Sequence, residues 1–318
     1  MPEITHGSET WTVPAGSNLL DALNEAGLHV PYSCRAGSCH ACLVRCVAGE
    51  PEDARPDALD PARQQEGWRL ACQCSVTENL SVAVFDPARE GSPALVQELD
   101  WLAEDVLRLR LLPDRPLRYE AGQHLVLWTA TGVARPYSLA SVPIDEFWLE
   151  FHLDCSRPGA FAEAARNLSA GDAIRLGQLH AGALRYDPDW QSRPLLLMAA
   201  GTGLAPLWGI LREALAQEHQ GPIRLLHFCR GDSYLQAALM RLADRHANLS
   251  VEVIDREQLH SRLQTLHVAS RQEMALICGA NDFVEACAKR MFLAGLPRGQ
   301  VLSDAFISRQ VDEDDAGS

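Results

Sequence analysis

The sequence predicts a multidomain protein: a β-grasp domain, then an antiparallel β-barrel, then an α/β domain with a parallel sheet. Three observations predict this fold class. The chain has 318 residues, which suggests more than one compact core. Short strands with one helix fill residues 1–90, and residues 94–192 are mostly short strands. From residue 193 to residue 318, strands and helices alternate, as in parallel sheets with crossover helices.

The first domain is expected to be a small sheet that grips one helix. Glu3–His6 and Thr10–Val13 are predicted strands around a Gly-Ser turn, and Leu80–Phe85 is a further strand. Ser17 is the expected N-cap of the helix. The leucines that follow share one side of that helix, which predicts a face packed against the sheet.

A cysteine motif lies in this first domain. Cys34, Cys39 and Cys42 have the spacing C-x4-C-x2-C, and two candidates for a fourth ligand, Cys72 and Cys74, lie about thirty residues downstream. This spacing is typical of plant-type [2Fe-2S] ferredoxins, in which four thiolates hold two iron ions and two sulfides. A structural zinc site is the alternative. Zinc ribbons usually have two C-x2-C pairs, and only Cys39 and Cys42 form one here, so the iron-sulfur interpretation is favoured.

Cys72 and Cys74 compete as the fourth ligand, because residues two apart in an extended segment point to the same face. The segment Leu70-Ala-Cys72-Gln resembles the Leu-x-Cys-Gln context of the last ligand in plant-type ferredoxins. That resemblance implies Cys72 as the ligand and Cys74 as a spare thiol. His40 lies inside the loop and is expected either beside the site or exposed to solvent, and not as a ligand, since a Rieske centre needs two histidine ligands on one iron.

The second domain is predicted from strands with alternating apolar residues. In Val106–Leu111 three leucines alternate with two arginines, so the leucines share one face. Leu125–Thr129 and Phe147–Leu153 are expected to alternate in the same way, and Gly and Pro separate the strands. A polar stretch, Asp86–Pro93, is the expected linker before this barrel.

Arg135-Pro-Tyr137-Ser138 is the second chemical motif. A forked, always-charged guanidinium suits a phosphate, and a tyrosine offers a flat face for a flavin ring. A serine hydroxyl can hydrogen-bond a ring nitrogen. The motif therefore indicates a flavin site within the predicted barrel.

The third domain is predicted as a nucleotide-binding α/β unit. Its expected strands are Leu195–Ala200, Ile223–Phe228, Ser250–Ile254 and Met274–Cys278, and its expected helices are Pro206–Glu218, Tyr234–His246 and Phe283–Ala294. The loop Gly201-Thr202-Gly203-Leu-Ala-Pro206 follows the first strand, so backbone amides can approach a diphosphate at the start of a helix. Pro206 is the expected first helical residue.

In this order the motifs resemble the NADH-dependent ferredoxin-reductase family. Specifically, they resemble reductase components of bacterial multicomponent oxygenases with an N-terminal plant-type ferredoxin domain, such as those of benzoate dioxygenase and methane monooxygenase. The resemblance implies that Arg135 binds the FAD phosphates, that Tyr137 covers the isoalloxazine face and that Ser138 lies near the reactive nitrogen. Gly159 corresponds to the glycine of the family's phosphate-binding Gly-x-x-Ser segment.

The resemblance also implies a nicotinamide site. Tyr137, Ser138 and Cys278 are the residues expected to act at the reacting atoms. Asp304 and Phe306 correspond to a late acid-x-aromatic segment. The residues expected to bind the pyridine nucleotide are Gly201, Thr202, Gly203, Pro206, Cys278 and Gly279.

Two departures from the family pattern concern the cofactors. The Gly-x-x-Ser segment is Gly159-Ala-Phe161-Ala162 here, so a phosphate-binding hydroxyl is absent and FMN stays an alternative to FAD. Ala280 replaces the proline of the family's Cys-Gly-Pro motif. Arg230 follows the second strand of the α/β domain, where it would meet a 2′-phosphate, so NADPH stays an alternative to NADH.

A hydride carries two electrons and a [2Fe-2S] cluster accepts one, so a flavin is needed between them. We expect an oxidoreductase that passes electrons from NADH through FAD to the cluster and on to a separate oxygenase. One alternative is the same chain serving another acceptor, such as a deoxysugar dehydratase. Another is a non-catalytic redox-sensing protein.

Charge and composition narrow the partners. The net charge of −14 disfavours nucleic acid and anionic membranes, and it suits an acidic ferredoxin face that docks on a basic patch of the acceptor. The N-terminal Met-Pro-Glu-Ile-Thr-His has no export signal, so a cytoplasmic location is expected. Pro194–Leu211 lacks charge, but its glycines and proline predict a strand and a helix instead of a membrane span. The acidic tail 311–318 is expected to fray.

Overall fold

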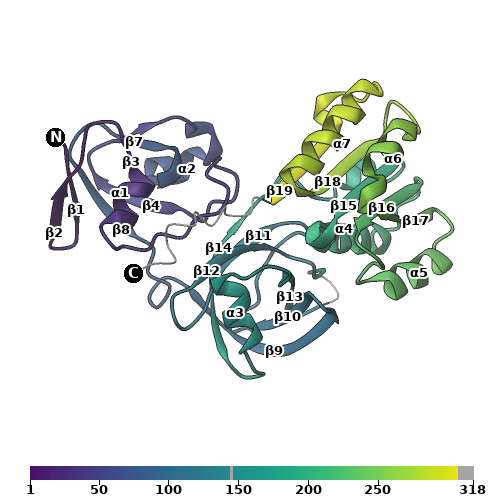
Figure 1. Ribbon diagram of the computed structural model, residues 1–318, viewed down its shortest axis with the longest axis horizontal. Helices are drawn as coiled ribbons and strands as arrows, with labels where there is room; N and C mark the ends of the chain where they lie inside the picture. The colour runs from purple at the N-terminus through teal and green to yellow at the C-terminus, as the bar shows by residue number, and fades with distance from the viewer. Residues whose placement is uncertain (144–145, 307–318) are drawn as a thin grey trace.

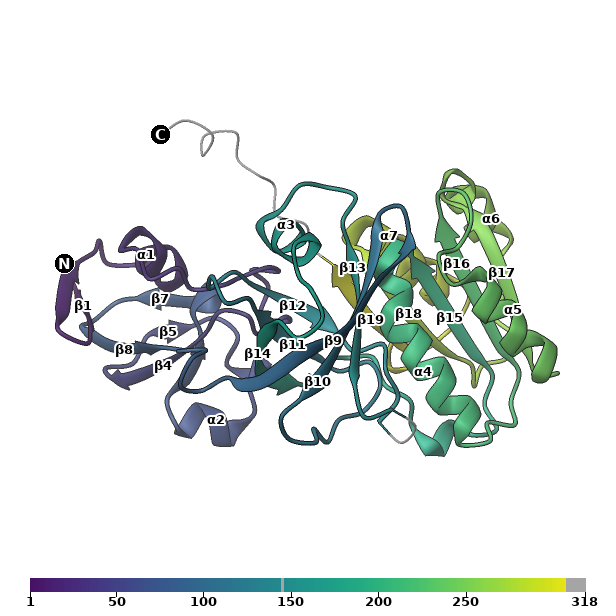
Figure 2. The ribbon, with the colours of Figure 1, turned by 90° about the horizontal axis from the view of Figure 1, so that it is seen from below.

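The computed structural model describes residues 1–143 and 146–306, and it has three parts (Figure 1). The N-terminal part and the C-terminal part lie on opposite sides of a central barrel, as both views show (Figures 1 and 2). The acidic tail expected to fray lies outside the described residues. The predicted fold class, with a β-grasp domain, a barrel and a parallel-sheet domain, is confirmed.

The N-terminal part consists of a five-stranded sheet, a small three-stranded sheet and the helix α1. The order of the larger sheet is β2-β1-β8-β4-β6. Leucines of α1 are fully buried against the sheets. The elements are β1 (Glu3–His6), β2 (Glu9–Thr12), β3 (Ser17–Asn18), α1 (Leu19–Glu25), β4 (Leu43–Ala48), β5 (Glu52–Asp53), η1 (Pro56–Ala58), α2 (Pro61–Gln65), β6 (Trp68–Leu70), η2 (Ala71–Gln73), β7 (Cys74–Val76) and β8 (Leu80–Val84).

The expected N-cap of α1 was wrong by one residue. The Asn18 side-chain oxygen accepts the N–H of Leu20 at 3.1 Å, and Ser17 instead pairs with Val76 in the small sheet. Asn18 also donates its amide to the Cys72 carbonyl oxygen at 3.1 Å. Asparagine is preferred here because one side chain both caps the helix and ties it to the segment of the fourth cysteine.

The central part is a six-stranded antiparallel sheet in the order β12-β11-β14-β9-β10-β13. The N–H of Ala140 after β12 donates to the Glu150 carbonyl of β13 at 2.8 Å, which joins the two edge strands and closes the barrel. Leu107, Leu109 and Leu111 are fully buried inside it, as predicted. The elements are β9 (Ser92–Ala103), β10 (Val106–Pro113), β11 (His124–Trp128), β12 (Ala134–Ser138), β13 (Leu149–Asp154), α3 (Ala160–Arg166), β14 (Ala173–His180) and η3 (Pro188–Trp190).

The strand β11 differs from its predicted alternation, because all of its residues are buried. One face of β11 points into the barrel. The other face carries Val126 and Trp128, which pack against Ala41 of the N-terminal part. The strand is therefore covered on both faces, which is the usual reason for a continuous apolar run.

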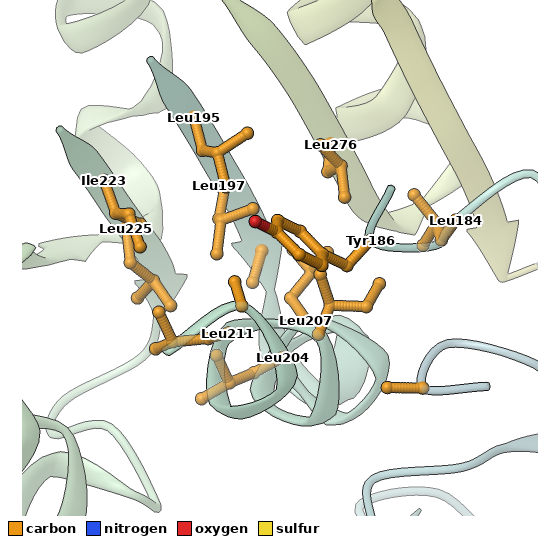
Figure 3. Close-up of a cluster of buried hydrophobic side chains, with 14 of the residues drawn as sticks. Leu184, Tyr186, Leu195, Leu197, Leu204, Leu207, Leu211, Ile223, Leu225 and Leu276 are labelled. Atoms are coloured by element: carbon orange, nitrogen blue, oxygen red, sulfur yellow. The ribbon is translucent and has the colours of Figure 1, made fainter. Parts of the chain in front are cut away.

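The C-terminal part is a five-stranded parallel sheet in the order β17-β16-β15-β18-β19. On one face, Leu195 and Leu197 of β15 pack with Leu207 and Leu211 of α4 (Figure 3). The other face packs on α6 and α7. The elements are β15 (Leu195–Ala200), η4 (Gly201–Gly203), α4 (Leu204–Ala216), β16 (Ile223–Cys229), α5 (Gln236–Arg245), β17 (Leu249–Asp255), η5 (Arg256–Gln258), α6 (Leu259–Thr265), β18 (Met274–Ala280), α7 (Asn281–Leu293), η6 (Arg298–Gln300) and β19 (Val301–Phe306).

The helix α4 begins at Leu204, so Pro206 is its third residue. The prediction that Pro206 is the first residue of the helix was wrong. The η4 turn leads directly into the helix, and a proline in the first turn costs no internal hydrogen bond. Among the described residues, no helix is both long and apolar enough to cross a membrane.

Candidate functional site

An open cavity of about 430 Å³ lies where the three parts meet. This volume is in the range of small-molecule sites. The sequence motifs of all three parts contribute to its wall. The predicted site residues that line it are Cys34, Cys39, Arg135, Tyr137, Ser138, Gly159, Thr202, Asp304 and Phe306.

Other predicted site residues do not line this cavity: Cys42, Cys72, Gly201, Gly203, Pro206, Cys278 and Gly279. Cys278 has no exposed surface, and burial raises the pKa of its thiol. Its backbone is nevertheless next to the glycine loop. A Cβ built on Gly203 would lie 2.3 Å from the Cys278 carbonyl oxygen, so only glycine lets η4 approach β18 this closely.

The first two cysteines of the motif share hydrogen bonds. The N–H groups of Ala36 and Cys39 each donate to Cys34 Sγ at 3.3 Å, and the N–H of Cys34 donates to Cys39 Sγ at 3.5 Å. The Cys39 thiol, with these amides, lowers the pKa of Cys34. Gly37 has a φ of 79°, a left-handed conformation that lets the loop turn back on its own sulfurs. The loop therefore favours a thiolate, which is the form that binds iron.

The third and fourth cysteines form a second pair. The Cys42 thiol donates to the Cys72 sulfur and lowers the pKa of Cys72. Gln73 Nε2 adds a hydrogen bond to Cys72 Sγ at 3.2 Å. Cys74 is different, because it is fully buried in β7 and burial raises its pKa.

Two thiol pairs match the needs of a two-iron cluster, in which each iron takes two protein thiolates. Within residues 1–143 and 146–306, no group of three or more His, Cys, Asp or Glu side chains is arranged to hold a single metal ion. The donor set thus fits a [2Fe-2S] cluster, and the amides around Cys34 and Cys39 suit its negative charge.

The flavin motif lies on β12, an edge strand beside the cavity. Ser138 is opposite His124 of the neighbouring β11, and Tyr137 is opposite Leu125. The Tyr137 ring lies 5.0 Å from the Phe161 ring of α3, and burial raises the Tyr137 pKa. An aromatic wall of this kind fits a flat, mostly apolar ring system such as a flavin.

Arg157 is a residue of the site that the sequence motifs did not predict. The structure places Arg157 in the cavity wall beside Gly159. Together with Arg135 it gives the cavity two guanidinium groups, which suit a diphosphate. The signal was available in the sequence, since Arg157 directly precedes a Pro-Gly turn.

Thr202 of η4 and residues of the last strand, β19, also line the cavity. Asp304 of β19 is paired in register with Cys278, and Phe306 is paired with Ala280. Burial raises the Asp304 pKa to about 6. The ends of β15, β18 and β19 therefore contribute to one edge, which is where parallel sheets bind nucleotides.

A polar chain that borders the cavity was also missed, and its member His152 lies in the cavity wall. Arg110 Nε donates to Glu150 Oε2 at 2.7 Å, and His152 Nε2 lies 3.0 Å from Glu150 Oε1. Because a carboxylate only accepts, His152 Nε2 carries the proton, and its Nδ1 accepts the Tyr234 hydroxyl at 3.0 Å. Tyr234 belongs to the C-terminal part, so this chain ties that part to the barrel. Its signal in the sequence is the presence of Glu150 and His152 at two buried positions of this strand.

The comparisons with known proteins agree with this geometry. Residues 4–77 match the 2Fe-2S iron-sulfur cluster binding domain, and residues 197–289 match the oxidoreductase NAD-binding domain. The chain is 32% identical to the ferredoxin–NAD(P)+ reductase component of the naphthalene 1,2-dioxygenase/salicylate 5-hydroxylase systems of Ralstonia, over 92% of this chain and 94% of that protein. The chain belongs to the family of ferredoxin–NAD(P)+ reductase components with an N-terminal [2Fe-2S] domain. It is an oxidoreductase with a [2Fe-2S] cluster, FAD and NAD(H) as cofactors.

Two further proteins are similar to this chain, one over a shorter part of the sequence and one in fold with lower identity. The reductase subunit of an aromatic O-demethylase of Amycolatopsis is 33% identical over 73% of each chain. The ferredoxin reductase in carbazole 1,9a-dioxygenase has the same fold, with a TM-score of 0.63, 21% identity and coverage of 96% of this chain and 98% of that chain. The expected membership in the ferredoxin-reductase family is thus confirmed.

Proposed function

We propose the following division of roles within the reductase. Cys34, Cys39, Cys42 and Cys72 hold the [2Fe-2S] cluster, and Arg135, Tyr137 and Ser138 hold FAD. The η4 loop and the ends of β18 and β19 receive the nicotinamide nucleotide. The observation that carries this assignment is the common cavity, whose wall contains members of all three sets.

When bound, FAD would supply two-electron chemistry with NADH and one-electron chemistry with the cluster. Tyr137 and Phe161 supply the apolar wall that keeps water from the ring. Arg135 and Arg157 neutralise phosphate charge, and Gly203 lets the nucleotide loop lie against β18. Cys278 does not line the cavity, and its role is to position the η4 loop, because its backbone lies directly against Gly203.

The chain delivers electrons to an oxygenase component, and we propose that this acceptor belongs to the aromatic-ring dioxygenases. The reductase components of naphthalene 1,2-dioxygenase in Pseudomonas putida and of terephthalate 1,2-dioxygenase in Comamonas are 30% and 31% identical to this chain. The reductase of a deoxyhexulose dehydrase from Yersinia pestis is 24% identical. The greater identity with dioxygenase reductases supports a dioxygenase, and not a deoxysugar dehydratase, as the electron acceptor.

The docking face is proposed on the N-terminal part. Residues 1–85 contain eleven Asp and Glu and five Arg, and no Lys, which gives a net charge of −6. An acidic surface steers a partner with a basic patch, and the effect weakens with salt. We also propose the cytoplasm as the compartment, because all ten cysteines are free thiols and the cluster requires reduced cysteines.

The test combines the cofactor-loaded protein with NADH and either the oxygenase component of a naphthalene-type dioxygenase or a deoxysugar dehydratase. The expected result is faster reduction of the oxygenase, with a rate that falls as the salt concentration rises from 0.05 to about 0.5 M. Faster reduction of the dehydratase would contradict the proposed acceptor. A rate independent of salt would contradict the acidic docking face.

A further inference from the structure

Three histidines gather where the cysteine loop meets the barrel. His124 of β11 is opposite Ser138 of β12 on one side and opposite His180 of β14 on the other. His40 follows Cys39 in the loop. Its ring centroid lies 4.8 Å from that of His180 and 6.4 Å from that of His124. The three rings therefore form a contact between the proposed cluster loop and the proposed flavin strand.

His124 makes a hydrogen bond across this contact. Its Nε2 lies 3.2 Å from the carbonyl oxygen of Cys39. A carbonyl only accepts, so Nε2 carries the proton and donates. Nδ1 of His124 has no hydrogen-bond partner among the described residues, and the side chain is 6% exposed. The single bond to Cys39 is thus the polar contact that orients this ring.

One side of that bond is apolar, and the other side borders the cavity, which His124 and Cys39 both line. Ala41, Val126 and Trp128 form a buried apolar cluster beside the bond, with Cys39 and Phe85 packed at its edge. A hydrogen bond in such a partly apolar place is stronger than one in water, and leaving its carbonyl without a donor is costly.

His180 makes further polar contacts between the barrel and the N-terminal part. The Nδ1 of His180 lies 3.2 Å from the Nδ1 of His40 and 3.4 Å from Nη1 of Arg63. Both His40 and Arg63 belong to the N-terminal part, and His180 belongs to the barrel. These contacts hold the two parts together but do not reach a proposed iron ligand directly. Among the described hydrogen bonds between the barrel and the N-terminal part, the His124 bond is the one that reaches the backbone of a proposed iron ligand.

We propose that His124 is a positioning residue for electron transfer from FAD to the cluster. By donating to the Cys39 carbonyl, it holds an iron-ligating residue at a fixed separation from Ser138, its neighbour across the β11–β12 ladder. In the transfer one electron leaves reduced FAD and one ferric iron becomes ferrous. No bond of His124 breaks, and its proton stays on Nε2. The inference rests on the proposed roles of Cys39 and Ser138.

The test compares two substitutions in the cofactor-loaded full chain. His124→Leu removes the donor, whereas His124→Gln keeps an N–H that can reach the same carbonyl. After anaerobic mixing with NADH, loss of flavin absorbance should be as fast in both variants as in the wild type. Reduction of the cluster should be about tenfold slower in the leucine variant, because an unpaired buried carbonyl shifts the docked population by that order. The glutamine variant should recover most of the rate.

A second measurement reads the contact itself. Arg89 is exposed in the linker between the N-terminal part and the barrel, so trypsin can cut there, and the N-terminal fragment leaves when the contact between the two parts opens. The leucine variant should release the N-terminal fragment faster than the wild type, and the glutamine variant should not. His6→Leu is the matched control, since His6 Nδ1 bonds to the Val82 carbonyl at 2.9 Å within the N-terminal part alone. It should leave both rates unchanged.

The outcomes separate this inference from the proposed function. A leucine variant that keeps iron and FAD and reduces its cluster at the wild-type rate would overturn the role of His124. If the leucine variant loses a cofactor, His124→Asn takes its place with the same expectation, because its shorter amide cannot reach the carbonyl. Absence of NADH-dependent cluster reduction in the wild type would instead overturn the proposed function.

Discussion

At the residue scale, the thiols proposed as iron ligands differ from Cys74 in what surrounds them. Cys72 accepts a side-chain hydrogen bond from Gln73 and pairs with Cys42. Cys74 is enclosed by apolar side chains in β7. The surroundings of Cys72 lower the pKa of its thiol and favour the thiolate, whereas the surroundings of Cys74 raise the pKa and favour the protonated thiol.

The first prediction follows from this difference. Cys72→Ser should abolish the assembled cluster, and Cys74→Ser should leave about two irons and two sulfides per chain. Iron and acid-labile sulfide analysis with the visible spectrum measures both. Equal cluster loss in the two variants would remove the assignment of Cys72 as the fourth ligand.

The second prediction concerns Glu150. Burial alone would raise its pKa, but the His152 hydrogen bond and the Arg110 guanidinium outweigh it and lower the pKa from 4.5 to about 2. A lowered carboxyl pKa stabilises the folded state above pH 4.5, and this stability is lost as the pH falls towards 2. The shift corresponds to about 3 kcal/mol. Glu150→Gln should therefore destabilise the protein at pH 7.

Urea unfolding of the wild type and Glu150→Gln at several pH values measures the effect. The difference in unfolding free energy should shrink as the pH is lowered from 5 towards 3, within the window set by the two pKa values. A difference that does not change over this range would show that the carboxylate charge is not the source of the stability.

Site residues that belong to a motif with a characteristic spacing could be predicted from the sequence. Site residues whose role depends on tertiary contacts could not. The cysteine motif and Arg135-Pro-Tyr137-Ser138 are local, so both were predicted. His124 and His152 lie in apolar strands, and their partners come from other parts of the chain. No local pattern contains those contacts. An ionisable residue inside a buried strand was the available signal.

At the scale of elements, the predicted strands of the parallel sheet agree with the structure within about two residues, as expected for a buried apolar run between glycine turns. The start of α4 was misplaced because η4 continues into it without a break. The alternation expected for β11 failed because its outer face packs on the N-terminal part. A sequence does not show which face a second domain covers.

The third prediction concerns the contact of η4 with β18. Gly203→Ala should weaken NADH binding and slow flavin reduction, because the new Cβ would lie 2.3 Å from the Cys278 carbonyl oxygen and must push the loop away. Steady-state kinetics should show a higher KM for NADH with FAD content unchanged. Gly299→Ala is the control, since nothing lies within 4 Å of its Cβ. Equal KM values for Gly203→Ala and the wild type would contradict the role of the loop.

At the scale of the whole molecule, three parts meet at one cavity, and this meeting was not predictable from motifs taken singly. The apolar contact of Val126 and Trp128 with Ala41 shows that the N-terminal part and the barrel share a buried surface. Deleting residues 1–90 would expose that surface. A full-length variant without the cluster is therefore the better test of how the parts divide the work.

The fourth prediction uses Cys72→Ser in this way. With FAD bound, it should still oxidise NADH with ferricyanide, which takes electrons directly from the flavin. It should reduce cytochrome c poorly, because the one-electron exit through the cluster is missing. Rates with the two acceptors measure this division. Efficient reduction of cytochrome c by the cluster-free variant would show that electrons leave by another route.

The central claim is that electrons reach the cluster only through FAD in the shared cavity. Electron paramagnetic resonance after anaerobic addition of NADH tests it most directly, with the full chain prepared with and without FAD and with iron content confirmed in both. The account predicts the signal of the reduced cluster in the FAD-loaded protein and none in the FAD-free protein. A reduced cluster without FAD, or an oxidised cluster beside fully reduced FAD, would contradict it.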